Sequence, residues 1–262
     1  MPRVLKTVIP RIRKSLHERG LLVSLSRSVL LPIHLLQEYT EARKLGATKL
    51  GATKLGATGA EKLRSEFDRE YDVTTDGDID GWTYLSDLNI PSANWINGRN
   101  YMPIAPFRFH AALSSLKIRF EDFVFIDFGS GKGRALLLAS DFAFKRVVGV
   151  EFAPELHAIA QRNIQKYGAR RKSGPVESVC MDFLVFPLPA EPSVFFFFDP
   201  CENAVLIQLL RRIRQSLDEN PRMAYIVYIA PTPSRKALLD ASEWMVKEKD
   251  DADVRFCVYR LK

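Results

Sequence analysis

The stretch Phe125-Ile-Asp-Phe-Gly-Ser-Gly-Lys-Gly-Arg134 decides the fold. An apolar run leads into glycine at every second position, and Ala135-Leu-Leu-Leu138 follows as the start of a helix. Glycine permits the tight turn from a strand into a helix, and it lets a ligand approach the backbone. The amides at the start of such a helix are donors for an anionic group. The stretch therefore predicts a strand, a ligand-binding turn and a helix.

Two common glycine-rich sites can be tested on the spelling of this turn. A phosphate-binding P-loop has Ser or Thr after its Gly-Lys pair and a Gly six residues before the Lys, whereas here Gly133 follows Lys132 and position 126 is Ile. A dinucleotide-binding fingerprint that starts at Gly129 has Gly at its sixth place, which is Arg134 here. The spelling favours neither site.

Outward from this turn, short apolar runs alternate with helical segments from Glu121 on. Strands are predicted at Phe123–Phe128, Arg146–Glu151, Val176–Asp182, Ser193–Asp199 and Arg222–Ile229, and helices at Gly133–Phe142, Pro154–Tyr167, Glu202–Leu217 and Pro233–Ala241. A continuous apolar strand is typical of a parallel sheet covered on both faces, and the alternation predicts a doubly wound α/β fold. Two further strands, Trp244–Lys249 and Val254–Leu261, are joined by the acidic turn Asp250-Asp-Ala-Asp253, and this hairpin makes at least one strand antiparallel.

Acidic residues recur at the ends of successive predicted strands. Glu151 lies about twenty residues after the glycine turn, where an acid accepts hydrogen bonds from ribose hydroxyls. Asp182 ends the third strand, where it can accept from an adenine amino group, and Asp199-Pro200 ends the fourth. One such acid is usually a helix cap or a solvated turn. With Asp127, four acids at one edge of a parallel sheet favour a ligand site instead.

On these residues, 121–262 resembles the class I S-adenosylmethionine-dependent methyltransferases. The resemblance implies a Rossmann-like seven-stranded α/β sheet with an antiparallel last strand, and S-adenosyl-L-methionine as cofactor. It implies that Glu151 holds the ribose, that Phe152 packs by the adenine and that Asp182 and Phe183 address the adenine. It also implies a binding site for the methionine end of the cofactor, made of Asp127, Gly129, Ser130, Gly131 and Gly133.

The spelling Gly-Ser-Gly-Lys-Gly-Arg is similar to that of a bacterial group of methyltransferases, distantly similar to Dot1-like and other lysine methyltransferases. That group has a Tyr-x-Pro element before the core, matched by Tyr101-Met-Pro103. The resemblance favours N-methylation of a protein lysine, with Asp199 and Tyr101 as the catalytic candidates. Cys201 and Glu202 stand where enzymes that methylate a planar base often have an aromatic residue, so a base is disfavoured. A small-molecule or nucleic-acid methyltransferase, or an inactive scaffold of the same fold, stays open.

The first sixty residues form a basic extension of the 262-residue chain, which has a net charge of +7. Val4, Leu5, Val8, Ile9 and Ile12 recur at helical spacing between Arg and Lys residues, which predicts a basic amphipathic helix. Such a helix binds an anionic membrane or nucleic acid, or it packs on the domain with its basic face in water.

The sequence predicts three parts. Residues 1–60 are the helical extension, ending in copies of Lys-Leu-Gly-Ala-Thr over 44–58 that are too short for a solenoid repeat and are interpreted as a linker. Residues 61–120 are a lead-in on the substrate side, and 121–262 are the cofactor-binding domain.

The cysteines and the apolar runs bear on the compartment. Cys180, Cys201 and Cys257 are odd in number and lack paired spacing, which disfavours disulfides and a zinc site. No run reaches the ~18 apolar residues that span a membrane. We expect a cytoplasmic protein, peripheral to the membrane if the basic helix binds lipid. Asp76-Gly-Asp-Ile-Asp-Gly81 matches half of a calcium loop, but Asp87 replaces its final Glu, so a solvated acidic turn is favoured and no metal ligand is predicted.

Overall fold

The computed structural model describes residues 66–78, 82–168 and 171–262. The predicted basic helix and the Lys-Leu-Gly-Ala-Thr repeat lie outside the described residues. The described residues other than 86–88 form one compact unit. The lead-in and the strand-helix core thus belong to the same unit, and the predicted division at residue 120 stays a prediction.

A seven-stranded sheet in the order β3-β2-β1-β4-β5-β7-β6 forms the centre of this unit. The first five strands run parallel, β7 is antiparallel to β5, and β6 is antiparallel to β7. The strands are β1 (Val124–Phe128), β2 (Arg146–Glu151), β3 (Val176–Cys180), β4 (Ser193–Phe197), β5 (Ala224–Ile229), β6 (Met245–Asp251) and β7 (Phe256–Leu261). This is the Rossmann-like methyltransferase sheet, and both the α/β class and the antiparallel last strand are confirmed.

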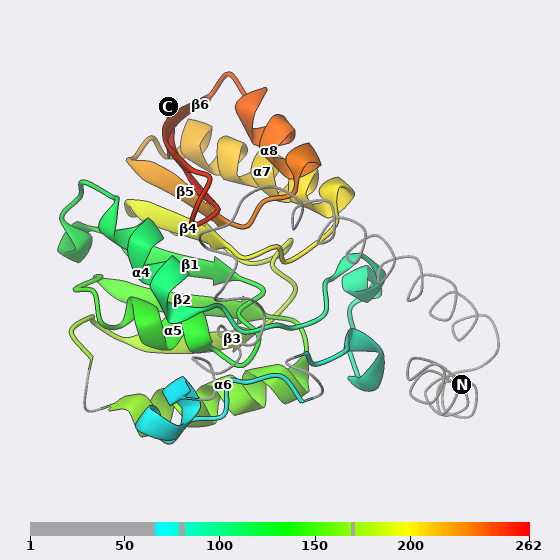
Figure 1. The fold of residues 1–262 in the computed structure, drawn as a ribbon. Coiled ribbons are helices and arrows are strands. Elements are labelled where there is room, and N and C mark those ends of the chain that lie inside the picture. Colours follow the sequence, from blue (N-terminus) through cyan, green and yellow to red (C-terminus); the bar gives the residue numbers. More distant parts are fainter. Residues whose placement is uncertain (1–65, 79–81, 169–170) are drawn as a thin grey trace. The chain divides into compact units, whose positions relative to one another are not determined.

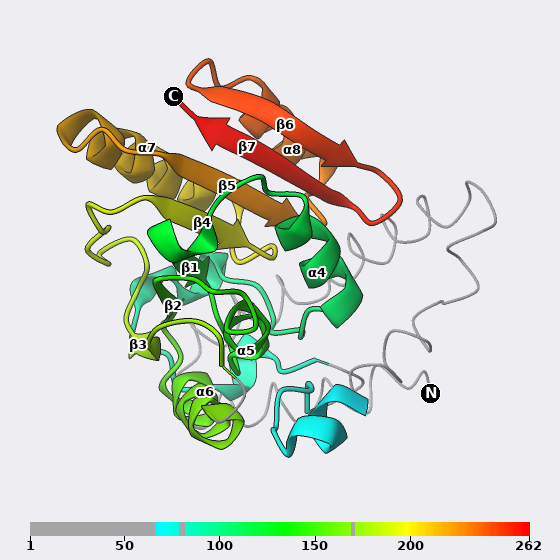
Figure 2. The same cartoon turned by 90° about the vertical axis from the view of Figure 1, so that its left-hand side faces the viewer.

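Helices cover both faces of the sheet (Figures 1 and 2). One face carries α4 (Pro106–Ser114), α5 (Arg134–Ala139) and α6 (Pro154–Tyr167), and the other carries α7 (Asn203–Glu219) and α8 (Pro233–Asp240). Short 3-10 turns lie at Leu85–Asp87, Ala93–Asn97 and Phe120–Asp122. None of the helices in the described part of the chain is long and apolar enough to cross a membrane.

Alternating side chains of the apolar strands supply both cores. Phe196 in β4 packs with the helices of the first face, whereas Phe195 and Phe197 pack with those of the second. All three are fully buried, and each contributes about 1.5–3 kcal/mol relative to an exposed ring. Burial on both faces explains why β4 reads as an unbroken apolar run.

The predicted elements shift only at their ends. β2 and α6 have the predicted bounds, while β3 and β4 end two residues before Asp182 and Asp199, which therefore lie in the loops that follow. The acidic turn is also displaced, because β6 continues to Asp251 and the chain reverses just before Phe256 instead. Arg255 in this reversal has φ 64°, a backbone conformation that no composition pattern signals.

Candidate functional site

The structure brings the four predicted acids to one edge of the sheet. Asp127 is in β1, Glu151 ends β2, and Asp182 and Asp199 follow β3 and β4. These strands are parallel neighbours in the order β3-β2-β1-β4, so their carboxyl ends meet at the same edge. Connections leave β1 and β4 in opposite directions across the sheet, and a ligand crevice forms at such a switch point.

The glycine turn after β1 has a backbone that only glycine adopts without strain. Gly129, Gly131 and Gly133 have φ of 83°, 54° and 86°. The expectation that its amides are free for an anionic group is wrong for most of them. The amides of Gly129 and Ser130 donate to the Val150 carbonyl, and that of Gly133 donates to the Ser130 carbonyl. The turn is therefore not a phosphate cradle, in agreement with its spelling.

Glu151 fastens the same turn from the next strand. Its Oε2 accepts the Gly131 amide at 2.8 Å, and its Oε1 accepts the Ala153 amide at 2.8 Å. Burial raises the pKa of Glu151 to about 7, although these backbone donors oppose the rise. Burial and the nearby Glu151 raise the pKa of Asp127 to about 8. Two buried carboxyl groups that repel one another make this edge favourable for a cation.

One buried polar atom of the turn fits a ligand. The Ser130 side chain is buried, and its Oγ has no hydrogen-bond partner within the described residues. A buried hydroxyl without a partner costs about 1–3 kcal/mol, so a ligand that offers it a donor or acceptor recovers this energy. Together with Asp127 and Glu151, it fits a molecule that carries both a cationic and a hydrogen-bonding end.

Asp182 already accepts several hydrogen bonds. Its Oδ1 accepts a hydrogen bond from the Leu184 backbone amide at 2.9 Å. Its Oδ2 accepts hydrogen bonds from the Ser92 hydroxyl and from the side-chain Nδ2 of Asn94, each at 2.7 Å. Phe183 packs edge-on against Phe128 at 5.8 Å, at the margin of the second core. No pattern in the sequence pointed to Ser92 and Asn94, which lie about ninety residues before Asp182 along the chain.

Asp199 lies between two guanidinium groups. Its Oδ1 is 2.8 Å from Nη1 of Arg235, and its Oδ2 is 3.3 Å from Nε of Arg99. Asp199 has φ 50°, a left-handed conformation that Asp tolerates better than most residues. The Tyr228 hydroxyl also lies 3.4 Å from Oδ1, at the limit of a hydrogen bond. The carboxylate is therefore held firmly, but its oxygens are not free in this conformation.

Tyr101 covers the glycine turn, as its Tyr-x-Pro setting led us to expect of a residue near the site. A Cβ on Gly131 would lie 2.1 Å from the Tyr101 ring, so the ring rests directly on the bare backbone. The Tyr101 hydroxyl donates to the Thr75 carbonyl at 2.6 Å. Burial raises the pKa of this phenol well above its usual value, so it stays protonated. Phe152 approaches the neighbouring Gly98 in the same way, with its ring 2.9 Å from a Cβ built there.

Sequence reasoning missed the role of the two basic residues in the turn. Nη2 of Arg134 lies 2.7 Å from Asp76 and 3.1 Å from Asp68, and Nζ of Lys132 lies 2.6 Å from Asp78. Both basic side chains are 1% exposed. These ion pairs, here called the clasp, join the lead-in (residues 61–120) to the glycine turn. The signal was the pair Asp76 and Asp78, which we had read as an acidic turn in solvent.

The same ion pairs occupy the first two acids of the Asp76–Gly81 pattern, which matches half of a calcium loop. The carboxylates of Asp76 and Asp78 pair with Arg134 and Lys132 instead of converging on one point. Within the described residues, no group of acidic, His or Cys side chains could hold a metal ion. Residues 79–81 of the pattern lie outside the described residues.

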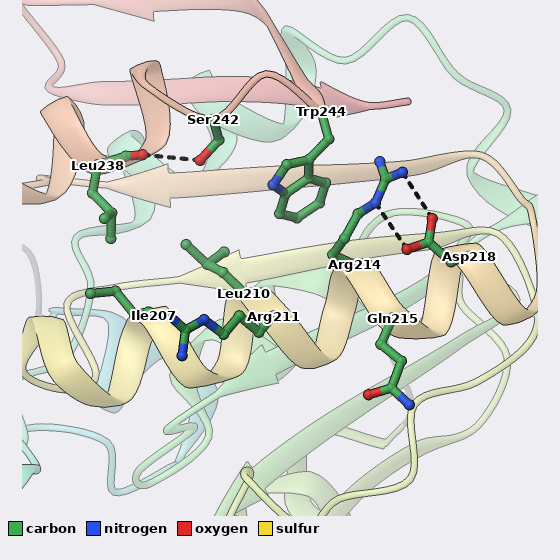
Figure 3. Close-up of a pocket in the computed structure, with 9 residues that line it drawn as sticks. All are labelled: Ile207, Leu210, Arg211, Arg214, Gln215, Asp218, Leu238, Ser242 and Trp244. Atoms are coloured by element: carbon green, nitrogen blue, oxygen red, sulfur yellow. Dashed lines mark hydrogen bonds and ion pairs between the residues drawn. The ribbon is translucent and has the colours of Figure 1, made fainter.

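Cys201, which follows Asp199-Pro200, and a hollow along α7 complete the description. Cys201 is buried, and burial raises its pKa to about 12, so it is not an activated nucleophile. A hollow of about 400 Å³ lies along α7 beside the turn before β6 (Figure 3). It is lined by Ile207, Leu210, Arg211, Arg214, Gln215, Asp218, Leu238, Ser242 and Trp244, none of which was predicted as a site residue.

A family model described as "Methyltransferase domain" matches residues 126–220, from β1 to the end of α7. No curated protein matches the sequence. Among solved structures, an RNA methyltransferase from Salinibacter ruber in complex with S-adenosyl-L-homocysteine is 19% identical and has a TM-score of 0.42, over 61% of this chain and 92% of that chain.

Two further solved structures are similar. The ribosomal protein L11 methylase from Lactobacillus delbrueckii subsp. bulgaricus is 13% identical with a TM-score of 0.44, over 59% of this chain and 76% of that one. A predicted N6-adenine-specific DNA methylase from Listeria monocytogenes is 13% identical with a TM-score of 0.46, over 61% and 51%. Residues 126–220, which hold the glycine turn and the four acids at the β1 to β4 edge, therefore match the model of a methyltransferase domain.

Proposed function

We propose that this protein is an S-adenosylmethionine-dependent methyltransferase that transfers the methyl group to an amine nitrogen, with the lysine side chain of a protein as acceptor. The observation that carries the proposal is the contact between the end of β4 and the glycine turn. A Cβ on Gly129 would lie 2.9 Å from Cβ of Pro200, so Asp199-Pro200 borders the turn directly. Oxygen acceptors for an amine and the proposed binding turn for the methionine end are therefore neighbours.

For the cofactor, the proposal assigns the residues of this edge by their chemistry. Asp127 and the turn Gly129–Gly133, with the Ser130 hydroxyl, would hold the methionine end, whose ammonium group would favour the charged form of Asp127. Glu151 would hold the ribose. Asp182 would accept from the adenine amino group, with Phe152 and Phe183 as apolar neighbours of the ring.

The mechanism is a direct displacement. S-adenosylmethionine, when bound, supplies a methyl carbon on a positively charged sulfur. The nitrogen–carbon bond forms as the carbon–sulfur bond breaks, and the amine must arrive without its extra proton. Asp199 and the Pro200 carbonyl would accept the remaining hydrogens and aim the lone pair, while Tyr101 would exclude water on the turn side. Alignment of this kind contributes more than any covalent help from the protein.

An amine suits this edge better than a planar base. Cys201 is buried and Glu202 follows it, so the segment after Asp199-Pro200 offers no aromatic ring for stacking. A lysine would instead take the place of Arg99, whose guanidinium group pairs with Asp199 and Glu202 in this conformation.

The test separates transfer from cofactor binding. In Asp199→Ala, transfer of labelled methyl groups into protein of a cell lysate should fall about 100-fold, because the amine loses its orientation. Affinity for S-adenosylhomocysteine, measured by calorimetry, should fall by no more than about threefold, since Asp199 would touch the acceptor and not the cofactor. Asp218→Ala, an exposed acid of α7 paired with Arg214, is the matched control. An equal loss of methyl transfer and of affinity for S-adenosylhomocysteine would make Asp199 a cofactor contact.

Two broader questions go with this proposal. A thermal shift with S-adenosylhomocysteine distinguishes an active cofactor site from an inactive scaffold, since a ligand of the native state raises its stability.

We further propose that the protein is cytoplasmic and that the basic extension over 1–60 holds it on an anionic surface. Sedimentation with anionic lipid vesicles should then weaken with added salt, and indifference to salt would refute this.

A further inference from the structure

The segment 92–101, here called the strap, crosses the edge at which the four acids meet. At the β3 end, the Ser92 hydroxyl and the Asn94 side-chain amide both donate to Oδ2 of Asp182. This carboxylate is the one that the proposed function gives to the adenine amino group. The strap therefore supplies donors where the ligand would supply its own.

At the end of β4 the strap also donates hydrogen bonds to acceptors that the proposed function assigns to a ligand. Nε of Arg99 donates to Oδ2 of Asp199 at 3.3 Å, and the Arg99 amide donates to the Pro200 carbonyl at 3.3 Å. These are the two acceptors that the proposed function gives to the amine. Nη1 of Arg99 also lies 3.1 Å from Glu202, so the side chain and the backbone amide of one residue together join the strap to Asp199, Pro200 and Glu202.

Backbone pairing completes the contact. Gly98 forms an antiparallel bridge with Cys201, and the Glu202 amide donates to the Asn97 carbonyl at 2.8 Å. The strap ends at Tyr101, whose ring rests on Gly131. It is thus fixed beside the glycine turn and held over the edge by Arg99.

We propose that Arg99 is a positioning residue that latches the strap across the ligand edge, and that this closed strap competes with cofactor and acceptor for the same oxygens. Binding then requires the strap to lift, so apparent affinity is the intrinsic affinity scaled by the open fraction. This inference rests on the proposed function, because that function assigns these oxygens to ligands.

The burial of the charged groups indicates that this latch can open. The side chains of Arg99, Asp199 and Glu202 are 17%, 26% and 33% exposed, so Arg99 can pass into water at moderate cost. Asp199 would keep the buried Arg235 at 2.8 Å and would not be left as an unpaired charge. Arg134, at 1% exposure, has no such freedom, so the lead-in stays clasped while the strap lifts.

The first test loosens the latch. In Arg99→Ala the open fraction should rise, so the association rate of S-adenosylhomocysteine should increase about tenfold, and Kd should fall by the same factor with an unchanged dissociation rate. Arg99→Lys keeps the positive charge but loses the two-pronged guanidinium geometry, so its association rate and Kd should lie between those of the wild type and of Arg99→Ala. Arg214→Ala removes an equivalent Arg–Asp pair on α7, drawn in Figure 3, and should change neither rate. Weaker binding in Arg99→Ala would overturn the latch.

The second test locks the strap. Gly98→Cys places a thiol opposite native Cys201, in a Cys180→Ser background that removes the exposed thiol. A Cβ on Gly98 would meet only the tips of Leu85 and Phe152 side chains at 2.8 and 2.9 Å and the Trp95 carbonyl at 3.3 Å, which small shifts can relieve. Oxidised glutathione would join the two thiols, and reductant would part them.

The stapled protein should bind S-adenosylhomocysteine at least about 100-fold more weakly, with full recovery after reduction. The same variant with Cys201→Ser cannot form the disulfide, so its affinity for S-adenosylhomocysteine should not change when oxidised glutathione is added. Equal binding by the oxidised and reduced forms would overturn the latch while leaving the proposed function intact. Absence of binding in the reduced wild type and in Arg99→Ala alike would instead refute the proposed function.

Discussion

The contact between Tyr101 and Gly131 leads to a prediction about Gly131→Ala. The new Cβ would lie 2.1 and 2.2 Å from Cδ2 and Cε2 of Tyr101, whereas carbon atoms in contact are normally about 3.5–4.0 Å apart. The ring cannot simply swing away, because its hydroxyl is bonded to Thr75 and Nζ of Lys132 lies 5.7 Å from its centre. Either the ring or the glycine turn must therefore move.

Two costs add in this variant. Overpacking against the ring costs about 1–3 kcal/mol, and a left-handed alanine at φ 54° costs about a further 1–2 kcal/mol. The free energy of unfolding should fall by about 2–5 kcal/mol, and binding of S-adenosylhomocysteine should be lost with the shape of the turn. In Gly131→Ala combined with Tyr101→Ala, only the left-handed strain remains from the alanine. The pair should thus be less destabilised than the sum of the single variants by about 1–3 kcal/mol.

Gly133→Ala is the matched control for this cycle. Its φ of 86° carries similar strain, but its Cβ would meet Ala160 at 3.1 Å and is not directed at Tyr101. Urea unfolding of both cycles should show coupling with Tyr101→Ala at Gly131 and additivity at Gly133. Additive energies in both cycles would refute the reasoning, because the ring would then not be the obstacle.

The other predictions concern charge. Burial raises the pKa of Asp127 to about 8 and that of Glu151 to about 7, so the folded protein binds extra protons between about pH 4 and 8. The melting temperature without ligand should therefore fall as pH rises from about 5 to 8 and then level off, and Asp127→Asn should flatten this slope. Affinity for S-adenosylmethionine should rise up to about tenfold per pH unit in the same range, with proton release in calorimetry. Arg134→Met should lower the free energy of unfolding by about 3–5 kcal/mol in urea, because Asp76 loses its buried partner. Calcium titration should give no heat, and measurable heat would mean that the carboxylates of Asp76 and Asp78 leave their cations.

Local patterns in the sequence predicted most of the sheet. Period, apolar runs and glycine spacing act over a few residues, which is why β2 and α6 have the predicted bounds. The ends of β3 and β4 were less predictable, because an acid after an apolar run reads equally well as the last strand residue or the first loop residue. The edge of four acids was predictable, since parallel strands carry their carboxyl ends to one side.

The partners of these acids could not be predicted, because they come from distant parts of the chain. Ser92, Asn94 and Arg99 lie in a segment with little regular structure, and nothing in their spacing indicates Asp182 or Asp199 as a target. Pairing of this kind depends on where the loop is carried by the fold. A prediction from local pattern finds the acceptors of the site and misses the donors that satisfy them.

The lead-in explains why the glycine turn carries basic residues at all. A turn that only bound a cationic cofactor would gain nothing from Lys132 and Arg134, whose charges would repel it. Both side chains instead reach the lead-in, where Asp68, Asp76 and Asp78 offset their charge. The glycines let Tyr101 approach the backbone while the residues between them hold the segment that carries Tyr101 and the strap. Removing the clasp should therefore weaken cofactor binding even though neither basic side chain is assigned to touch the cofactor.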